Sequence, residues 1–262
     1  WARSNPDGAI DWAESHHEGD GANPWMVGVI KGLAASDSSR ATDLMNAMPY
    51  SRQRGEALSA LMPQMLAQGP DFAKGWVDGF ADDRLRDGAI RRVSEALAQT
   101  DPAGTADWLL TSGADGAWRS MDDVMGAWAS QDESAARSYF QSLPSGDMRS
   151  SALRGLTNHM ATQNPREAAD FLDANAADAN DQVYEQFVYH GYRNDPGLVA
   201  EYISRVEGSR EQERLYRRVL DHWLFQDYDA ASNWIIGREF PENVSRRLER
   251  RIEEMQGNSN SN

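Results

Sequence analysis

A short phrase recurs along the chain at intervals of 31 or 32 residues. It is clearest at 101–108 (Asp-Pro-Ala-Gly-Thr-Ala-Asp-Trp), where an Asp or Asn comes first, Pro second, a small residue fifth and an aromatic residue eighth. Eight copies begin at Asn5, Asp37, Gly69, Asp101, Asp132, Asn164, Asp195 and Asp227. Seven of the eight have an aromatic residue at place 8, although aromatic residues make up 9% of the chain. Such a repeat predicts one supersecondary unit stacked many times.

Each copy has the features of two helices separated by a turn. The opening Asp or Asn can accept hydrogen bonds from the free backbone N–H groups of a helix start. Pro is tolerated next because its missing N–H has no partner there. Apolar residues at places 5, 8 and 9 follow helical spacing, turn formers come next, and a second apolar stripe occupies places 22, 25 and 29. We expect the small residue at place 5 to allow close helix approach and the aromatic residue at place 8 to fill the core.

Neither helix of such a pair could bury its apolar stripe alone, so neighbouring pairs must stack. We therefore predict an all-α fold, an α–α superhelix (solenoid) of about eight two-helix repeats spanning residues 1–256. Residues 1–4 align with the end of a preceding repeat, so we expect the natural chain to continue upstream of Trp1 and to carry any targeting signal there. Residues 257–262 contain no apolar residue and are expected to form a disordered tail.

The phrase resembles the junction of tetratricopeptide repeats, in which an Asp-Pro pair precedes a helix with a small and then an aromatic residue. Two copies match that spacing, Asp101-Pro102 with Trp108 and Asn5-Pro6 with Trp12. The period is shorter than the roughly 34 residues of that family, and its Leu-Gly pair is absent from the first helix. Other residues resemble a related bacterial helical repeat: Leu143-Pro144-Ser145-Gly146, then Arg149 and Ala152-Leu153. The resemblance implies peptide or protein binding on a concave face.

Charge and composition disfavour several classes of function. The chain has 26 basic and 41 acidic residues, and its net charge of −15 argues against a general nucleic-acid binder. The absence of cysteine rules out disulfides, thiolate metal sites and cysteine nucleophiles. No apolar run approaches the roughly 18–20 residues of a membrane-spanning helix, so we expect no membrane insertion. Both cytoplasm and periplasm are compatible with this composition.

The sixth copy departs most from the pattern, because aromatic residues crowd its second helix. Tyr184 and Phe187 fall on the apolar stripe, whereas Tyr189 and Tyr192 lie off it. Aromatic side chains off the stripe indicate a contact surface. The alternative is an enlarged local core.

Three histidines, His159, His190 and His222, fall at or next to place 28 of successive copies. Equivalent residues of stacked helices lie about 8–10 Å apart. That is too far for all three to bind one zinc ion at about 2.0–2.1 Å. We expect either a row of binding residues beside Tyr189 or hydrogen-bonded packing next to the core, and we predict no metal or cofactor.

Basic residues gather in three copies. In the third copy, arginines alternate with aspartates, which predicts a mixed, solvated face: Arg84, Arg86, Arg91 and Arg92 with Asp82, Asp83 and Asp87. The last two copies have basic second helices, with Arg210, Arg214, Arg217, Arg218, Arg246, Arg247, Arg250 and Arg251. The alternatives there are a solvated terminal face and a docking surface for an acidic partner.

No catalytic motif stands out: there is no phosphate-binding glycine loop, no His-Glu-x-x-His and no Gly-x-Ser-x-Gly. We therefore expect a non-catalytic scaffold that binds a protein or peptide partner, with candidate binding residues Tyr189, Tyr192, His159, His190 and His222. One alternative is a helical-repeat nucleic-acid binder, which would need a positive groove. The other is an all-α toroid enzyme acting on carbohydrate through paired carboxylates.

Overall fold

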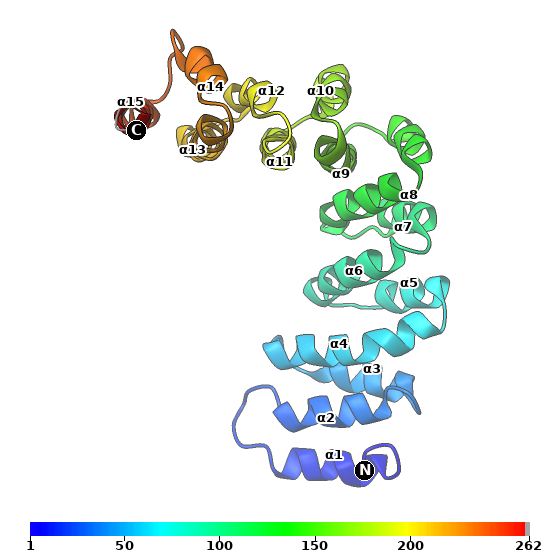
Figure 1. The fold of residues 1–262 in the computed structure, drawn as a ribbon. Coiled ribbons are helices and arrows are strands. Elements are labelled where there is room, and N and C mark those ends of the chain that lie inside the picture. The colour runs from blue at the N-terminus through cyan, green and yellow to red at the C-terminus, as the bar shows by residue number, and fades with distance from the viewer. Residues whose placement is uncertain (260–262) are drawn as a thin grey trace. The chain divides into compact units, whose positions relative to one another are not determined.

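The computed structural model describes residues 1–259, and over that range it contains fifteen α-helices, three short 3-10 helices and no strand. The prediction of an all-α chain is therefore confirmed. The described chain divides into two compact units, Trp1–Ser120 and a second that begins at Met121 (Figure 1). The repeat predicts one continuous solenoid over residues 1–256, and the regular spacing of the copies does not indicate this division.

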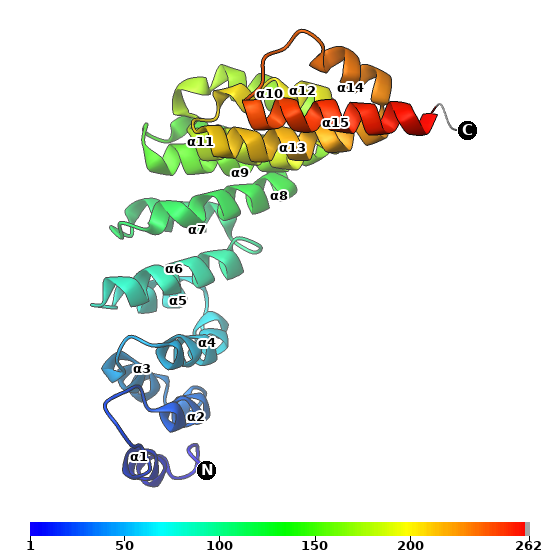
Figure 2. The ribbon, with the colours of Figure 1, turned by 90° about the vertical axis from the view of Figure 1, so that its left-hand side faces the viewer.

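Unit 1 consists of two layers of helices (Figure 2). It comprises α1 (Pro6–Ser15), α2 (Pro24–Leu33), α3 (Ser38–Ala47), α4 (Arg52–Ala67), α5 (Pro70–Asp78), α6 (Asp83–Leu97), α7 (Pro102–Thr111) and η1 (Ala117–Ser120). Helices α2, α4, α6 and η1 pack in succession. Side-chain hydrogen bonds connect α1, α3, α5 and α7 in the other layer, including Trp76 to Thr42 and Trp108 to Asp78.

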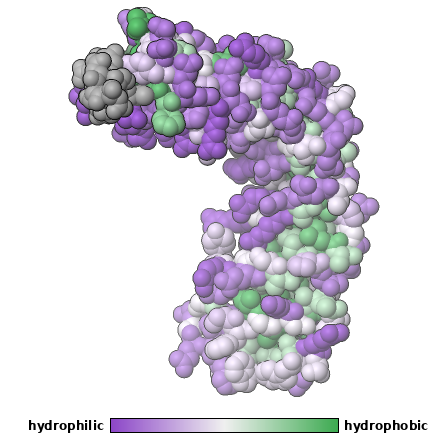
Figure 3. Space-filling view, in the orientation of Figure 1, coloured by the Kyte–Doolittle hydropathy of each residue, from purple (hydrophilic) through white to green (hydrophobic). Residues whose placement is uncertain are grey.

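Unit 2 is layered in the same way (Figures 1 and 2). It comprises α8 (Met121–Ser142), α9 (Asp147–Gln163), α10 (Pro165–Ala174), η2 (Ala176–Asp178), α11 (Asp181–Gly191), α12 (Pro196–Ala200), η3 (Ile203–Arg205), α13 (Ser209–Gln226), α14 (Tyr228–Ile235) and α15 (Glu242–Ser259). Helices α9, α11, α13 and α15 lie side by side, and α10, α12 and α14 form the other layer. On the face in Figure 3, apolar residues gather over unit 1, whereas unit 2 is mostly hydrophilic.

A helix starts at each of the eight aligned positions. In seven of them the Asp or Asn side chain accepts a hydrogen bond from the backbone N–H three residues later, with φ between −151° and −142°. Within the continuous α8, Asp132 has this same non-helical backbone, so it separates two helical segments. Gly69 has no side chain to act as a cap. Such caps stabilise a helix by about 1 kcal/mol each.

The small residue at place 5 is buried in every copy, as the sequence predicted. These residues are Ala9, Ala41, Ala73, Thr105, Ala136, Ala168, Val199 and Ala231. A larger side chain would separate the helices that meet there, because protein interiors are close-packed.

The aromatic residues at place 8 lie at the edge of the core, so the expectation that they fill it is only partly right. Trp108 and Tyr202 are buried, but Trp12 is 39% exposed and the others are half-buried. The deepest residues stand one place later, at place 9: Ala13, Met45, Val77, Leu109, Phe140, Leu172 and Ile203. One residue further along a helix turns the side chain by about 100°, which moves it from the edge to the centre.

The polar atoms of these edge aromatics explain their position. The indole N–H of Trp108 donates to the Asp78 carboxylate at 3.1 Å, and the hydroxyl of Tyr202 donates to Asp173 at 2.8 Å. Each partner belongs to the preceding first helix, so each bond joins neighbouring copies. A buried Trp or Tyr needs such a partner for its N–H or O–H.

The Arg149 side chain links the two helices of the fifth copy to the next copy by hydrogen bonds. Its Nε donates to Asp178 at 2.7 Å, and its Nη1 donates to the carbonyls of Phe140 and Leu143 at 2.8 Å. Arg54 plays the same part in unit 1, where it pairs with Asp82 at 2.7 Å. The planar guanidinium provides several fixed donors at once, which suits a joint between three segments.

At the C-terminus, α15 extends to Ser259 and so includes the first three residues of the expected tail. Residues 260–262 of that tail lie outside the described residues. No helix in the described part of the chain combines the length and apolar character that crossing a membrane requires.

Candidate binding site

The C-terminal end of α11 brings together three of the five candidate residues. Tyr189, His190 and Tyr192 line a cavity of about 290 Å³, and the rest of the lining is Thr162, Arg193 and Asn194. Thr162 lies on the last turn of α9, whereas Arg193 and Asn194 belong to the turn before α12. The cavity therefore lies at the ends of two neighbouring helices of unit 2.

The apolar residues of α11 determine which way Tyr189 points. Val183, Phe187 and Val188 are fully buried, and Tyr184 is nearly so. Tyr189 comes next after this buried face and is 47% exposed. The prediction that Tyr184 and Phe187 face the core while Tyr189 lies off the stripe is confirmed.

Tyr192 is less exposed than the sequence suggested, because α13 packs beside α11. It is half-buried, and its ring makes an edge contact with His222 of α13 at a centroid distance of 5.2 Å. Its hydroxyl accepts a hydrogen bond from Arg193 Nε at 3.2 Å. Tyr192 thus forms one wall of the cavity and contributes less free surface than Tyr189.

Two arginines that were not among the candidates complete the site. The Arg218 guanidinium lies 4.7 Å from the ring centre of Tyr189, and that of Arg193 lies 5.7 Å from the ring centre of Tyr192. Neither forms an ion pair with a carboxylate among the described side chains. We call Tyr189, His190, Tyr192, Arg193 and Arg218 the tyrosine strip. Arg193 could have been found from its place beside Tyr192, whereas Arg218 was one of many basic residues.

The three histidines do not form one site. His190 lines the cavity, and its half-burial lowers its pKa below the ordinary value, so it is neutral at pH 7. His222 contacts Tyr192 from behind, and its Nε2 is buried without a hydrogen-bond partner in the described structure. His159 is outside the lining, with its Nε2 3.1 Å from the side-chain nitrogen of Gln163. The described residues contain no group of three His, Asp or Glu placed to hold a metal ion.

The electrostatics of the strip favour an anion. The C-terminal ends of α9 and α11 both border the cavity, and each carries about half a negative charge. Arg193 and Arg218 bring two full positive charges, so the positive sign prevails. The hydroxyl of Tyr189 has no hydrogen-bond partner among the described residues, which leaves a donor and acceptor beside these charges.

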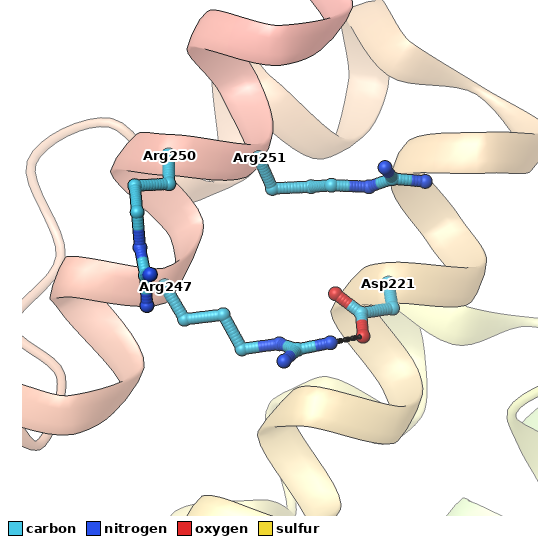
Figure 4. A pocket seen from close by; sticks show the side chains of 4 residues that line it. All are labelled: Asp221, Arg247, Arg250 and Arg251. Carbon is cyan, nitrogen blue, oxygen red and sulfur yellow. Dashed lines mark hydrogen bonds and ion pairs between the residues drawn. The ribbon is translucent and has the colours of Figure 1, made fainter.

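A second cavity of unit 2 lies between α13 and α15 (Figure 4). Its volume is about 430 Å³, and its lining is Asp221, Arg247, Arg250 and Arg251. Arg247 donates to Asp221 at 2.5 Å, and the side chains of Arg247 and Arg251 both extend from α15 toward α13. Part of the basic surface expected in the last two copies is thus a cavity wall rather than a flat face.

Comparison of the chain with protein-family models, with curated proteins and with solved structures gives no match.

Proposed function

We propose that the chain is a non-catalytic scaffold that binds a peptide or protein segment at the tyrosine strip. One observation carries the proposal: the exposed Tyr189 borders a cavity of about 290 Å³, and the Arg218 guanidinium over its ring has no carboxylate partner among the described side chains. Tyr and Arg are among the residue types that dominate binding energy at protein interfaces.

We also propose that the helices belong to a tetratricopeptide-like solenoid of about eight repeats of 31–32 residues. The eight helix starts at the aligned positions, together with the buried small residue at place 5, support this reading. In a stack of repeats, the residues packed between neighbouring copies are similar from copy to copy, whereas the residues on the outer faces can vary. Four of the five residues of the tyrosine strip belong to the sixth copy, which departs most from the common pattern, and Arg218 belongs to the seventh.

The chemistry of the strip favours a segment with a carboxylate next to an aromatic or apolar side chain. A carboxylate would pair with Arg193 or Arg218, whose planar donors match its two oxygens. The exposed ring of Tyr189 offers area to an apolar neighbour at little entropic cost, since its side chain has only two χ angles. Arg193 also holds the Tyr192 hydroxyl, so that ring is already oriented.

The test is a selection of binding peptides from a displayed library of random sequences, with the full chain as bait. Selected peptides are synthesised, and their dissociation constants are measured by fluorescence polarisation. We expect the selected sequences to be enriched in Asp or Glu beside an apolar residue. Tyr189→Ala and Arg218→Ala should each weaken binding about tenfold or more.

Phe225→Ala is the matched control, because Phe225 of α13 is an exposed aromatic residue like Tyr189 of α11 but does not line the cavity. It should leave the affinity unchanged. If the selected peptides bind the Tyr189 and Arg218 variants as tightly as the unaltered chain, the strip is not the binding site.

A further inference from the structure

Unit 1 has its own cavity, between α4 and α6, and arginines dominate its lining. Its volume is about 320 Å³, at the lower end of the usual range for ligand sites. Tyr50, Leu58 and Leu85 supply apolar surface, and none of the lining residues is acidic. We call this site the arginine pocket, after its five arginines: Arg52, Arg54, Arg84, Arg91 and Arg92.

Among the described side chains, carboxylates pair with two of the five arginines. Arg54 pairs with Asp82 at 2.7 Å, and Arg52 pairs with Glu56 at 3.3 Å.

Among the described side chains, Arg84, Arg91 and Arg92 have no carboxylate within ion-pair distance. Arg92 donates to the carbonyl of Gly55 at 3.1 Å, and Arg84 lies 5.2 Å from the ring centre of Tyr50. Three guanidinium charges therefore surround the cavity without an internal counter-charge.

The expected mixture of charges is present at Arg86, which pairs with Asp83 at 3.0 Å, whereas Arg84, Arg91 and Arg92 line the cavity. Arg84 and Arg91 are exposed, as a solvated face requires.

Two glycines on facing helices keep the cavity open. A Cβ atom at Gly55 of α4 or at Gly88 of α6 would meet nothing within 4 Å. Both residues line the pocket and lie inside helices, where Gly is less stable than Ala. A side chain at either position would enter the open space of the pocket.

Arg54 adds a largely buried guanidinium to the wall of the same site. Its side chain is more than nine-tenths buried, and its Nε has no hydrogen-bond partner in the described structure. Asp82 and the carbonyl of Asn46 hold its other nitrogens at 2.7 and 3.2 Å. The guanidinium is thus fixed in place by a carboxylate and a carbonyl.

We propose that the arginine pocket binds a doubly charged oxyanionic group on a peptide, either a phosphorylated side chain or two adjacent carboxylates. A phosphoryl group has about −1.5 to −2 charges near neutral pH and three acceptor oxygens, which suits several guanidinium forks at once. Tyr50, which is 73% exposed, gives an apolar flanking side chain a surface to contact.

The surroundings of the pocket favour a peptide over a nucleic acid. A strand of nucleic acid has a phosphate at every nucleotide and needs a continuous positive track. Along α4 and α6 the track is interrupted by Glu56, Asp83, Asp87 and Glu95. A short positive pocket within acidic surface suits one compact anion.

This inference rests on the proposed function in one respect, namely that the ligand is a peptide. The site itself is independent, because the tyrosine strip lies in the other unit. The two sites therefore respond to different substitutions. If the arginine-pocket variants alone lose peptide binding, the peptide binds at the arginine pocket. If the Tyr189 variant alone loses it, the peptide binds at the tyrosine strip.

The test uses the full chain and fluorescein-labelled peptides that share leucine flanks and differ at the centre: phosphoserine, Glu-Glu or serine. An oligo-dT strand of similar charge is the fourth probe. By fluorescence polarisation, we expect the phosphoserine or the Glu-Glu peptide to bind at least tenfold more tightly than the serine peptide. The stronger of the two identifies the source of the oxyanion.

Two kinds of variant test the pocket itself. Arg84→Ala/Arg91→Ala removes charge and should weaken binding at least tenfold. Gly88→Leu fills the cavity, keeps every charge and should weaken binding as much. Gly75→Leu is its matched control, since Gly75 of α5 also has open space around it but lies outside the pocket. Thermal melts of all variants check that each one folds.

Three outcomes would overturn the inference. The first is equal binding of all three peptides, and the second is unchanged affinity in both folded pocket variants. The third is tighter binding of oligo-dT than of either anionic peptide. If Tyr189→Ala abolishes binding of the anionic peptides while the pocket variants retain it, the ligand sits on the tyrosine strip, and only the pocket inference fails.

Discussion

Trp108 and Tyr189 are both aromatic residues on helices of the repeating pattern, but the molecule uses them in opposite ways. Trp108 is 7% exposed, and its indole N–H donates to Asp78 of the preceding first helix. Tyr189 is 47% exposed, and its hydroxyl has no partner among the described residues. Trp108 recurs at the same place in other copies as Trp, Tyr or Phe, whereas Tyr189 belongs to one copy.

The difference separates residues that hold the helices together from residues available to a ligand. An aromatic ring whose polar atom is already bonded inside the fold stabilises the joint between copies. A ring that stays exposed beside a guanidinium without a carboxylate partner is available to contact a ligand. The same criterion separates Arg149, fully engaged by Asp178 and backbone carbonyls, from Arg218.

The largest effect that sharpens this comparison is on stability. Trp108→Ala should lower the free energy of unfolding by about 3–5 kcal/mol, because it removes a large buried ring. Tyr189→Ala should change it by less than about 0.5 kcal/mol. Urea denaturation followed by circular dichroism measures both. A large loss for Tyr189→Ala would mean that this ring is part of the core.

The second prediction compares two arginines. Arg149→Ala should cost about 2–3 kcal/mol, because it leaves the largely buried Asp178 and two carbonyls without their donor. Arg218→Ala should be close to neutral for stability. The same denaturation experiment measures both. Equal losses of unfolding free energy would contradict the view that Arg149 holds helices together while Arg218 is a surface residue.

The third prediction concerns the cap at the joint. Asp101 caps α7 and also pairs with the nearly buried Lys74 at 3.2 Å, so Asp101→Ala should cost about 1–2 kcal/mol. Asp101→Asn keeps the cap, loses the charge and should cost less than Asp101→Ala. If both substitutions are neutral, the recurring Asp has no role in stability.

The smallest effect is a pH dependence near the strip. Burial lowers the pKa of His190 in the folded chain below its ordinary value of about 6.5. The unfolded chain therefore binds the proton more readily, and stability should fall as pH drops below about 6.5. His190→Asn should reduce this slope. Denaturation midpoints measured from pH 7 to pH 5 test the difference, and identical slopes would contradict it.

The sequence could predict the parts of the fold that depend on local pattern. A cap, a small residue and a helical stripe each act within a few residues, so the helix starts and the burial of place 5 follow from the sequence. The choice between place 8 and place 9 as the core centre depends on how neighbouring copies are rotated. Tyr139 and Phe140 are adjacent and both aromatic, yet only Phe140 is fully buried.

The sites were harder to predict, because pairing is decided across the fold. Asp82 stands beside Arg84 in the sequence but pairs with Arg54, which is 28 residues away. Arg84 is therefore left without that carboxylate, and a mixed run of charges becomes a positive cavity. In the same way Arg218 meets Tyr189 only because α13 packs beside α11. The break into two units also has no signal in the regular spacing of the copies.

Hydrogen–deuterium exchange of the full chain, with and without a library-selected peptide, tests the central claim most directly. Our account predicts slower exchange at the end of α11 and in the turn that follows, 188–194, with no change in α7 around Trp108. Protection centred on α7 or the other first helices, with none at 188–194, would contradict it.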